Sequence, residues 1–421
     1  MISELAGRAT GSTSLPSMNR VRCPPFRVSE HRNTLKRGPQ AVRPGSWPRC
    51  ADRGSGRLAL FTSLALSLLV LLMAGCQTGK VSPAEGPAGR LESQPGWVRS
   101  GFLFDEAPFP SSHASTLVET KDGVLAAWFG GPHERHPEVV IWTARYDGTR
   151  WSTPVQVADG IQPDGKTRFP CWNPVLFQPT RGPLLLFFKV GPSPEAWWGM
   201  LMASTDAGRT WSQPRRLPDG QVGPVRNKPV LLPDGAVLCG SSTEDRGWRV
   251  HMERTPDLGV TWERTPPLND GRELGLIQPT ILRWPSGRTQ MLCRSKQEQV
   301  FESWMEADWK TWSPFAPTVL PNPNSAIDAV MLKDGRALLV YNHTSRGRSP
   351  LNVAVSRDGR HWQGAAVLEN EPGEYSYPAV VQARDGRVHV TYTWKRQRIK
   401  HVVLDPAKLR PRDLTEGRWP E

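Results

Sequence analysis

The chain has 421 residues, of which 38% are hydrophobic and 22% charged, so it has enough apolar material for a sizeable core and a wholly disordered protein is excluded. Its formal charge of +13 suggests a polyanion binder, but residues 1–57 carry ten Arg and one Lys against three carboxylates, which leaves only +5 for the rest. Nucleic acid is therefore not predicted as a partner. The 38 Gly and 41 Pro favour a turn-rich all-β chain over a long-helix protein.

The N-terminal region predicts export. Residues 1–57 are basic and show no apolar periodicity, so we expect them to be disordered or not translated. An uncharged, Leu-rich run over 58–75 follows and ends in small residues, which is the layout of a secretory signal. The sequence Met73-Ala74-Gly75-Cys76 resembles the bacterial lipobox, in which the Cys becomes the lipidated first residue.

We therefore expect a signal segment and lipobox over 58–76, with Cys76 anchoring the protein to a membrane of the bacterial cell envelope, facing the periplasm or the exterior. The alternative is a transmembrane anchor, because about 18 apolar residues just suffice to span a bilayer. Residues 77–98 are rich in Gly, Pro, Ser and Glu and are expected to form a flexible linker.

Cysteine and histidine spacing does not predict a metal site. Only Cys171, Cys239 and Cys293 lie beyond the leader, too few and too scattered for a disulfide framework or a CxxC-type metal site. His133 and His136 have a possible ligand spacing but no obvious third ligand. Neither a metal nor a cofactor is predicted.

A pattern of an apolar run, a Gly turn and a second β-type run occurs six times from residue 110 onward. The turn glycines are separated by 59, 53, 52, 48 and 51 residues, and they are Gly123, Gly182, Gly235, Gly287, Gly335 and Gly386. A period near fifty indicates a solenoid or a propeller, and each unit has room for four short strands. We predict an all-β six-bladed β-propeller of four-stranded antiparallel blades over 99–410, followed by a tail over 411–421. The sixth unit lacks an outer strand, which residues 101–106 are expected to supply, so that the ring closes without an open edge.

A second repeat lies inside the first. Its clearest copy is STDAGRTW over Ser204–Trp211, and the weaker copies end at Trp151, Trp262, Trp312 and Trp362. The pattern resembles the Asp-box of sialidases and other BNR-repeat proteins. Its Asp and hydroxyl groups are expected to bind backbone amides of the turn, so that Asp206, Asp257 and Asp358 are structural rather than catalytic.

The repeat also sorts the polar residues by face. The Gly turns and Asp-box turns of each blade should share one face, so the starts of the first strands and the loops after the second strands should share the other. The strand starts contribute His113, Trp172, Asn173, Arg226, Asn227, Lys228, Gln278, Asn324, Ser325, Asp328, Tyr375 and Tyr377. The loops contribute His133, Glu134, His136, Lys189, Glu244, Arg294, Lys296, Asn342, Arg346, Arg348, Lys395, Arg396 and Arg398. A concave face of mixed charge suits an anionic polar ligand such as an acidic sugar.

Residues 100–405 resemble the sialidase-like BNR family as a whole. Sialidases are retaining glycosidases with an arginine cluster on the sugar carboxylate, a Tyr nucleophile helped by a Glu, and an Asp acid/base. The resemblance implies Tyr375 as nucleophile, Glu244 as its carboxylate partner, and Asp328 or Glu134 as acid/base. It implies substrate contacts from Arg226, Lys228, Arg294, Arg346, Arg348, Gln278, Asn173, Tyr377, His113 and Glu134. The first arginine of the family lies in an R-I-P element at the start of the first blade. The sequence departs from the family there, because it has His113-Ala114-Ser115 at that place.

The resemblance predicts a lipid-anchored glycosidase that hydrolyses terminal acidic sugars of a glycan. Two alternatives remain open: a lyase that removes a proton next to a uronate carboxylate with Tyr or His as base, and a non-catalytic glycan-binding propeller. At single positions, the tyrosines could simply line the channel and Asp328 could fix a turn.

Overall fold

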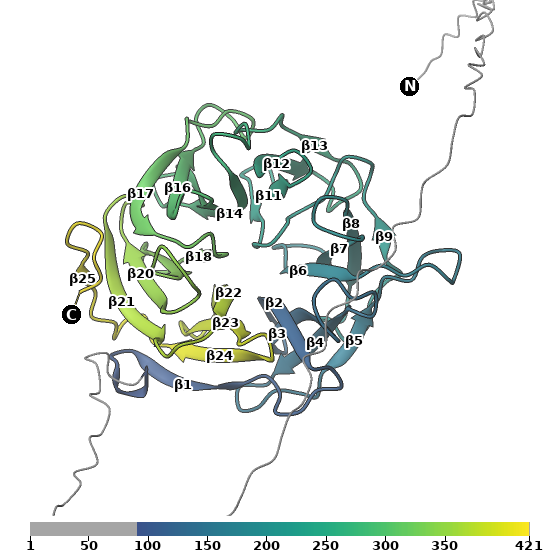
Figure 1. The fold of residues 1–421 in the computed structure, drawn as a ribbon, viewed down its shortest axis with the longest axis horizontal. Helices are drawn as coiled ribbons and strands as arrows, with labels where there is room; N and C mark the ends of the chain where they lie inside the picture. The colour runs from purple at the N-terminus through teal and green to yellow at the C-terminus, as the bar shows by residue number, and fades with distance from the viewer. Residues whose placement is uncertain (1–90, 421) are drawn as a thin grey trace, which may run out of the picture. The chain divides into compact units, whose positions relative to one another are not determined.

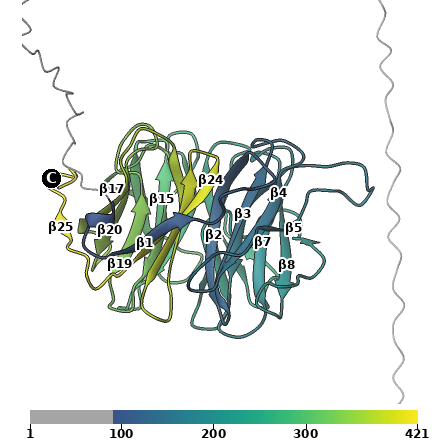
Figure 2. The same cartoon turned by 90° about the horizontal axis from the view of Figure 1, so that it is seen from below.

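Twenty-five strands and one short 3-10 helix, η1 (Leu91–Ser93), make up the regular structure of residues 91–420, the part of the chain that the computed structural model describes. The strands form six antiparallel sheets around a central axis, so the predicted six-bladed β-propeller is confirmed (Figure 1). Figure 2 shows the strands running between the two faces of the ring.

The blades follow one another along the chain, each starting with its innermost strand. Blade 1 contains β2 (Ser111–Thr120), β3 (Gly123–Gly131), β4 (Val140–Tyr146) and β5 (Val155–Ala158). Blade 2 contains β6 (Cys171–Phe177), β7 (Leu184–Val190), β8 (Trp198–Ser204) and β9 (Arg215–Arg216). Blade 3 contains β10 (Val230–Leu231), β11 (Val237–Thr243), β12 (Arg249–Thr255) and β13 (Glu263–Arg264).

The second half of the ring repeats this order. Blade 4 contains β14 (Leu276–Arg283), β15 (Thr289–Ser295), β16 (Gln299–Trp304) and β17 (Ala316–Pro321). Blade 5 contains β18 (Asp328–Met331), β19 (Ala337–Tyr341), β20 (Leu351–Ser356) and β21 (Trp362–Glu369), and blade 6 contains β22 (Tyr375–Gln382), β23 (Val388–Trp394) and β24 (Arg398–Leu404).

The N-terminal strand closes the ring. β1 (Trp97–Phe102) pairs antiparallel with β24 and becomes the outer strand of blade 6, where Figure 1 shows the blue β1 beside the yellow β24. The predicted closure is therefore confirmed, although the strand begins before residue 101. Residues 91–98, expected to belong to a flexible linker, are packed instead: Leu91 is buried, and the side-chain amide of Gln94 bonds to both backbone polar groups of Val367. The expected C-terminal tail contains β25 (Arg412–Asp413), a fifth strand on blade 5.

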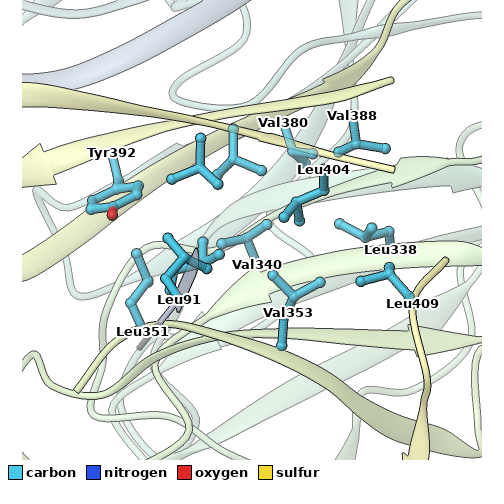
Figure 3. Packing of buried hydrophobic residues seen from close by; sticks show 14 of the residues in the cluster. Leu91, Leu338, Val340, Leu351, Val353, Val380, Val388, Tyr392, Leu404 and Leu409 are labelled. Carbon is cyan, nitrogen blue, oxygen red and sulfur yellow. The ribbon is translucent and has the colours of Figure 1, made fainter. Parts of the chain in front are cut away.

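Apolar side chains fill the space between neighbouring blades. Between blades 5 and 6, the sheets bring together Leu338, Val353, Val380 and Val388, all inaccessible to solvent (Figure 3). Burying a side chain of this kind contributes about 1.5–3 kcal/mol. Because every blade is covered on both faces in this way, its inner strands are apolar on both sides and the ring is held by packing rather than by disulfides; Cys171, Cys239 and Cys293 are buried free thiols.

The Asp-box turns have the structural role that the sequence predicts. The Asp206 carboxylate accepts hydrogen bonds from the backbone N–H groups of Arg209 and Thr210 and from the hydroxyls of Ser204 and Thr210. These bonds, above all the one from the Thr210 hydroxyl, hold the pKa of Asp206 well below its usual range. Asp257 and Asp358 make equivalent contacts, so none of the three is available for catalysis.

A β-bulge interrupts the innermost strand in four blades. The register shifts between His113 and Thr116 in blade 1, and the same shift recurs in blades 2, 4 and 6. At each bulge one non-Gly residue has a positive φ, namely Ala114, Asn173, Gln278 and Tyr377. A left-handed residue in a bulge redirects the side chains around it, and such residues are frequent at functional sites.

The predicted leader lies outside the described residues. Its basic extension, signal segment and lipidation site at Cys76 therefore have no structural counterpart here. Within residues 91–420, the structure contains no helix of the length and apolarity needed to cross a membrane.

Candidate functional site

Three arginine side chains from successive blades converge at one end of the central channel, the face on which the sequence predicts the site. Arg226 precedes the first strand of blade 3, Arg294 lies in β15 and Arg348 in the loop after β19. Burial holds the pKa of the His113 imidazole well below its usual value, and the positive charges of Arg396 and of these three arginines lower it further. Burial lowers the pKa of Arg226 to about 10, and burial with repulsion from Arg294 lowers the pKa of Arg348. Cations gathered where water is scarce favour an anionic partner.

Tyr377 lies among these arginines. Its hydroxyl accepts a hydrogen bond of 3.0 Å from Arg294 Nη1, and the guanidinium carbon of Arg226 lies 5.3 Å from its ring centroid. Because the bulge gives Tyr377 a φ of 52°, its side chain leaves blade 6 and reaches residues of blades 1, 3 and 4.

His113 packs against the same tyrosine. The two ring centroids are 4.0 Å apart, and His113 Nδ1 shares a hydrogen bond of 2.8 Å with the hydroxyl of Thr393. Nε2 of His113 is buried and makes no hydrogen bond within the described part of the chain. Burial and the neighbouring arginines keep the imidazole neutral, and Nε2 is the ring nitrogen without a partner among residues 91–420.

Glu244 lies close to Arg294 and Trp248. It follows β11, and burial raises its pKa even though the charge of Arg294 opposes this shift. The indole of Trp248 lies under Arg294, with its ring centroid 4.8 Å from the guanidinium carbon. A carboxyl whose pKa is raised by burial is a candidate proton donor.

A second ion-pair group borders the site. Arg396 binds Glu374 at 2.6 Å through Nε and Glu134 at 2.5 Å through Nη1, which links the loop after β3 to blade 6. Glu374 also accepts a hydrogen bond of 3.2 Å from Ser376. The predicted substrate residue Glu134 thus forms an ion pair with Arg396, which also binds Glu374 of its own blade.

Tyr375, expected to be the nucleophile, is placed elsewhere. Its side chain is 1% exposed and belongs to the apolar cluster between blades 5 and 6, and burial raises the pKa of its hydroxyl. In a regular strand, residues 375 and 377 would face the same side. The bulge separates them, so the tyrosine that meets the arginines is Tyr377 and the expectation for Tyr375 is corrected.

Asp328, expected to be the acid/base, is fully bonded. Its carboxylate accepts from Lys228 Nζ at 2.8 and 2.9 Å, from the Thr280 hydroxyl at 3.0 Å and from the Val380 amide at 2.9 Å. It therefore joins blades 3, 4, 5 and 6 across the channel, and the four hydrogen bonds from these three donor groups leave the carboxylate no free position for a substrate proton. The alternative of a purely structural Asp328 fits this geometry.

Lys228 is also withdrawn from the expected substrate site. Its ammonium group binds Asp328 and the carbonyl of Ala329, and it borders a cavity of about 950 Å³ at the channel end that carries the Gly turns. Arg346, also expected to contact the substrate, is exposed in its loop and makes no side-chain hydrogen bond among the residues described, so its role stays a prediction.

The remaining predicted contacts are near the cluster. Gln278 is buried at the blade 4 bulge, where its Oε1 accepts a hydrogen bond of 3.2 Å from Arg294. Asn173 is buried at the equivalent position of blade 2 with a φ of 30°. Of the predicted site residues, the structure thus brings together Arg226, Arg294, Arg348, Gln278, Tyr377 and His113, with Glu244 beside them.

The sequence analysis missed two residues of the site, Glu374 and Trp248. Glu374 directly precedes the first strand of the sixth unit, so the rule that strand starts face the site could have found it. Trp248 lies in the loop after the second strand of the third unit and was overlooked because only polar residues were considered there. Residues 91–420 contain no group of three His, Cys, Asp or Glu side chains able to hold a metal ion.

Comparisons with known proteins identify a family and several solved structures that are similar to this chain. The family described as "BNR repeat-like domain" matches residues 122–390. No curated protein matches the sequence. Among solved structures, a protein of unknown function from Dyadobacter fermentans shares 18% identity at a TM-score of 0.63, covering 76% of this chain and 100% of that one.

Two further structures have named activities. The NanB sialidase of Streptococcus pneumoniae, as its K499G mutant, shares 11% identity at a TM-score of 0.61, covering 76% of this chain and 72% of its own. The α-L-arabinanase of Penicillium chrysogenum, solved with arabinobiose, shares 16% identity at a TM-score of 0.57, covering 75% of this chain and 99% of its own. At these identities the likeness concerns the fold, which is sialidase-like.

Proposed function

This chain belongs to the BNR repeat-like domain family, and from that premise we propose that it is a glycan-cleaving enzyme that recognises the carboxylate of an acidic sugar. The observation that carries the proposal is the convergence of Arg226, Arg294 and Arg348 on Tyr377 and His113. Its relatives in fold include enzymes that act on glycans, which agrees with this substrate class without identifying the sugar.

The arginines suit a carboxylate for a chemical reason. Guanidinium groups donate in a planar fork that matches the two carboxylate oxygens. Nη1 of Arg348 and the Nε atoms of Arg226 and Arg294 are buried and have no hydrogen-bond partner in residues 91–420, so the cluster retains donors beyond those that hold it in place. An acidic sugar would supply both the missing acceptors and the missing negative charge.

Hydrolysis is the first reaction that we propose for this site. Tyr377, as phenolate, attacks the anomeric carbon while the glycosidic C–O bond breaks and the leaving oxygen takes a proton from the Glu244 carboxyl. Water then attacks the glycosyl-tyrosine, gives a proton back to Glu244 and releases the sugar. A Tyr nucleophile avoids bringing a carboxylate against the carboxylate of the substrate.

Elimination is a second candidate, favoured by the contact between His113 and Tyr377. With Nδ1–H donating to Thr393, the lone pair of His113 Nε2 would accept the proton next to a uronate carboxylate. The C–O bond on the adjacent ring carbon would then break as the C=C bond forms, and the Tyr377 phenol would protonate the leaving oxygen. The arginines would lower the barrier to proton removal by neutralising the negative charge of the carboxylate.

The test is a substrate screen with the full chain carrying Cys76→Ser, which removes the proposed lipid site. We expect release of sugar from sialosides or from uronate-ended oligosaccharides, and a loss of about 100-fold in kcat/KM for Arg294→Met, because a buried charge contact is worth about 2–5 kcal/mol. An ultraviolet-absorbing unsaturated product indicates elimination, and its absence with sugar release indicates hydrolysis. Saturable binding without any product across the panel would leave a non-catalytic glycan-binding propeller and refute the enzyme proposal.

A further inference from the structure

A groove between blades 2 and 3 opens on the same face as the arginine cluster. It encloses about 270 Å³ and is lined by the loop after β7, the connection between β9 and blade 3, and the loop after β11. By the strand order, all three segments lie at the strand-start face of the ring. The groove and the proposed site therefore share one face of the ring.

Glu244 connects the groove and the site along the chain. Its two chain neighbours, Thr243 and Asp245, line the groove, while the charge of Arg294 acts on Glu244 from the site. Glu195, which also lines the groove, raises the pKa of Glu244 through its negative charge. Glu244 thus stands at the boundary between the arginine cluster and the groove.

An aromatic wall forms the inner part of the groove. Trp197 is half-buried, and its ring centroid lies 5.9 Å from that of Trp172, the residue that precedes Asn173 at the channel mouth. Trp198 is covered by Arg216, whose guanidinium carbon is 4.8 Å from its ring centroid. Of these two indoles, Trp198 is occupied by the arginine, so Trp197 presents the available aromatic surface. Sugars pack their C–H faces on such rings, because an indole combines a broad apolar face with a polar N–H.

The charges of the groove are balanced, in contrast to the arginine cluster. Arg249 pairs with Asp245 at 3.0 Å and Arg216 with Asp219 at 3.4 Å, while Arg264 donates to the carbonyl of Gly220. A ligand in the groove therefore meets paired donors and acceptors next to an aromatic face, and no net field that selects an anion. Hydroxyl groups of a neutral sugar fit this environment.

We propose that the groove is a subsite for a neutral sugar unit of the same glycan whose acidic unit binds at the arginines, with Trp197 as its stacking platform. This inference rests on the proposed function, because it assigns the second unit of that substrate. It makes the protein selective for oligosaccharides over isolated acidic sugars.

The experiment compares matched ligands on the full chain with Cys76→Ser. The two pairs are N-acetylneuraminic acid with 3′-sialyllactose, and glucuronic acid with a trisaccharide ending in glucuronate, each titrated by calorimetry. For the pair that binds, we expect the trisaccharide to bind about tenfold more tightly than the monosaccharide, the gain of one added contact of about 1.4 kcal/mol. Trp197→Ala should remove this advantage and leave the affinity for the monosaccharide unchanged.

Two control variants separate the possible failures. Trp309→Ala, a half-buried indole beside the Asp-box turn of blade 4 at the opposite face, should keep the trisaccharide advantage. Arg294→Met should weaken both members of the pair, since it acts on the acidic unit. A trisaccharide advantage that survives Trp197→Ala overturns the subsite but leaves the proposed function intact. If neither pair binds to the wild-type protein, both the subsite and the proposed function are refuted.

Discussion

A substitution of Asp328 tests whether this residue stabilises the fold or acts as a proton donor in catalysis. The resemblance to sialidases implies that it donates a proton, whereas the structure makes it the acceptor of four hydrogen bonds from three other blades. Replacing it by Asn keeps the shape of the side chain but removes its charge and puts an NH₂ group where one of the carboxylate oxygens accepts.

The magnitude follows from the burial of the pair. Removing one partner of a buried ion pair typically costs about 3–5 kcal/mol, because the other charge remains unpaired. The Asp328 side chain is only 4% exposed, but that of Lys228 is 22% exposed and borders the large cavity on the Gly-turn face, so water can reach the orphaned ammonium group. We therefore expect Asp328→Asn to lower the free energy of unfolding by about 3 kcal/mol, toward the lower end of that range.

The assay is urea unfolding followed by tryptophan fluorescence, with Asp105→Asn, an exposed carboxylate, as the control that should change little. A double variant, Asp328→Leu with Lys228→Met, should be less destabilised than the sum of its single variants, because no buried charge is left alone. Unchanged stability in Asp328→Asn together with complete loss of turnover would refute the structural assignment and restore the acid/base role.

Three other predictions follow from the same structure. Tyr377→Phe should abolish turnover while Tyr375→Phe keeps it near the wild-type rate, as measured by sugar release; the reverse order of the two variants would contradict the placement of the tyrosines. Lys189 was expected at the site, but it is fully buried and donates to the Pro224 carbonyl, and burial lowers its pKa to about 7 from 10.5. Between these two pH values the unfolded chain binds a proton that the folded chain does not. The free energy of unfolding of the wild type should therefore rise between pH 7 and about pH 9 relative to that of Lys189→Met. Urea denaturation that gives the same change in unfolding free energy for both proteins would disprove this. Cys76→Ser should move the protein from the membrane fraction to the soluble fraction of expressing cells and abolish labelling with a fatty-acid analogue, whereas retention in the membrane would favour a transmembrane anchor.

The ring could be predicted because its determinants are local and repeated. Each Gly turn and each Asp-box is specified by a few adjacent residues, and the period of about fifty fixes how many blades the chain can form. The convergence of Arg226, Arg294 and Arg348 could also be predicted, since strand starts and the loops after second strands must share a face in an antiparallel blade.

The errors arose where the backbone departs from regular geometry. A regular strand gives residues 375 and 377 the same orientation, so the sequence offered no reason to separate Tyr375 from Tyr377, and the bulge that does so depends on packing across the ring. Likewise, Arg346 and Arg348 are two residues apart in one loop, and only the contacts of that loop, including the hydrogen bond from Arg348 to Asn324, bring one of them to the site.

The partners of Asp328 could not be predicted for a related reason. Lys228 lies one hundred residues away, and its pairing with Asp328 depends on both side chains pointing into the channel rather than toward its mouth. A charged residue at a strand start is predicted to lie on the face of the site, whether its side chain binds a substrate or another charged residue. The sequence therefore predicted the set of charged residues but not the division between the site and the ion pair that crosses the channel.

The central claim is that the arginine cluster binds a carboxylate, and a titration with an acid and its ester tests it most directly. The full chain carrying Cys76→Ser is titrated with an acidic trisaccharide that it binds and with the methyl ester of the same trisaccharide, which retains every other group. We predict that esterification weakens binding at least about tenfold, because the charge-assisted hydrogen bonds to Arg226, Arg294 and Arg348 are lost. Equal affinity for the acid and the ester would contradict the account.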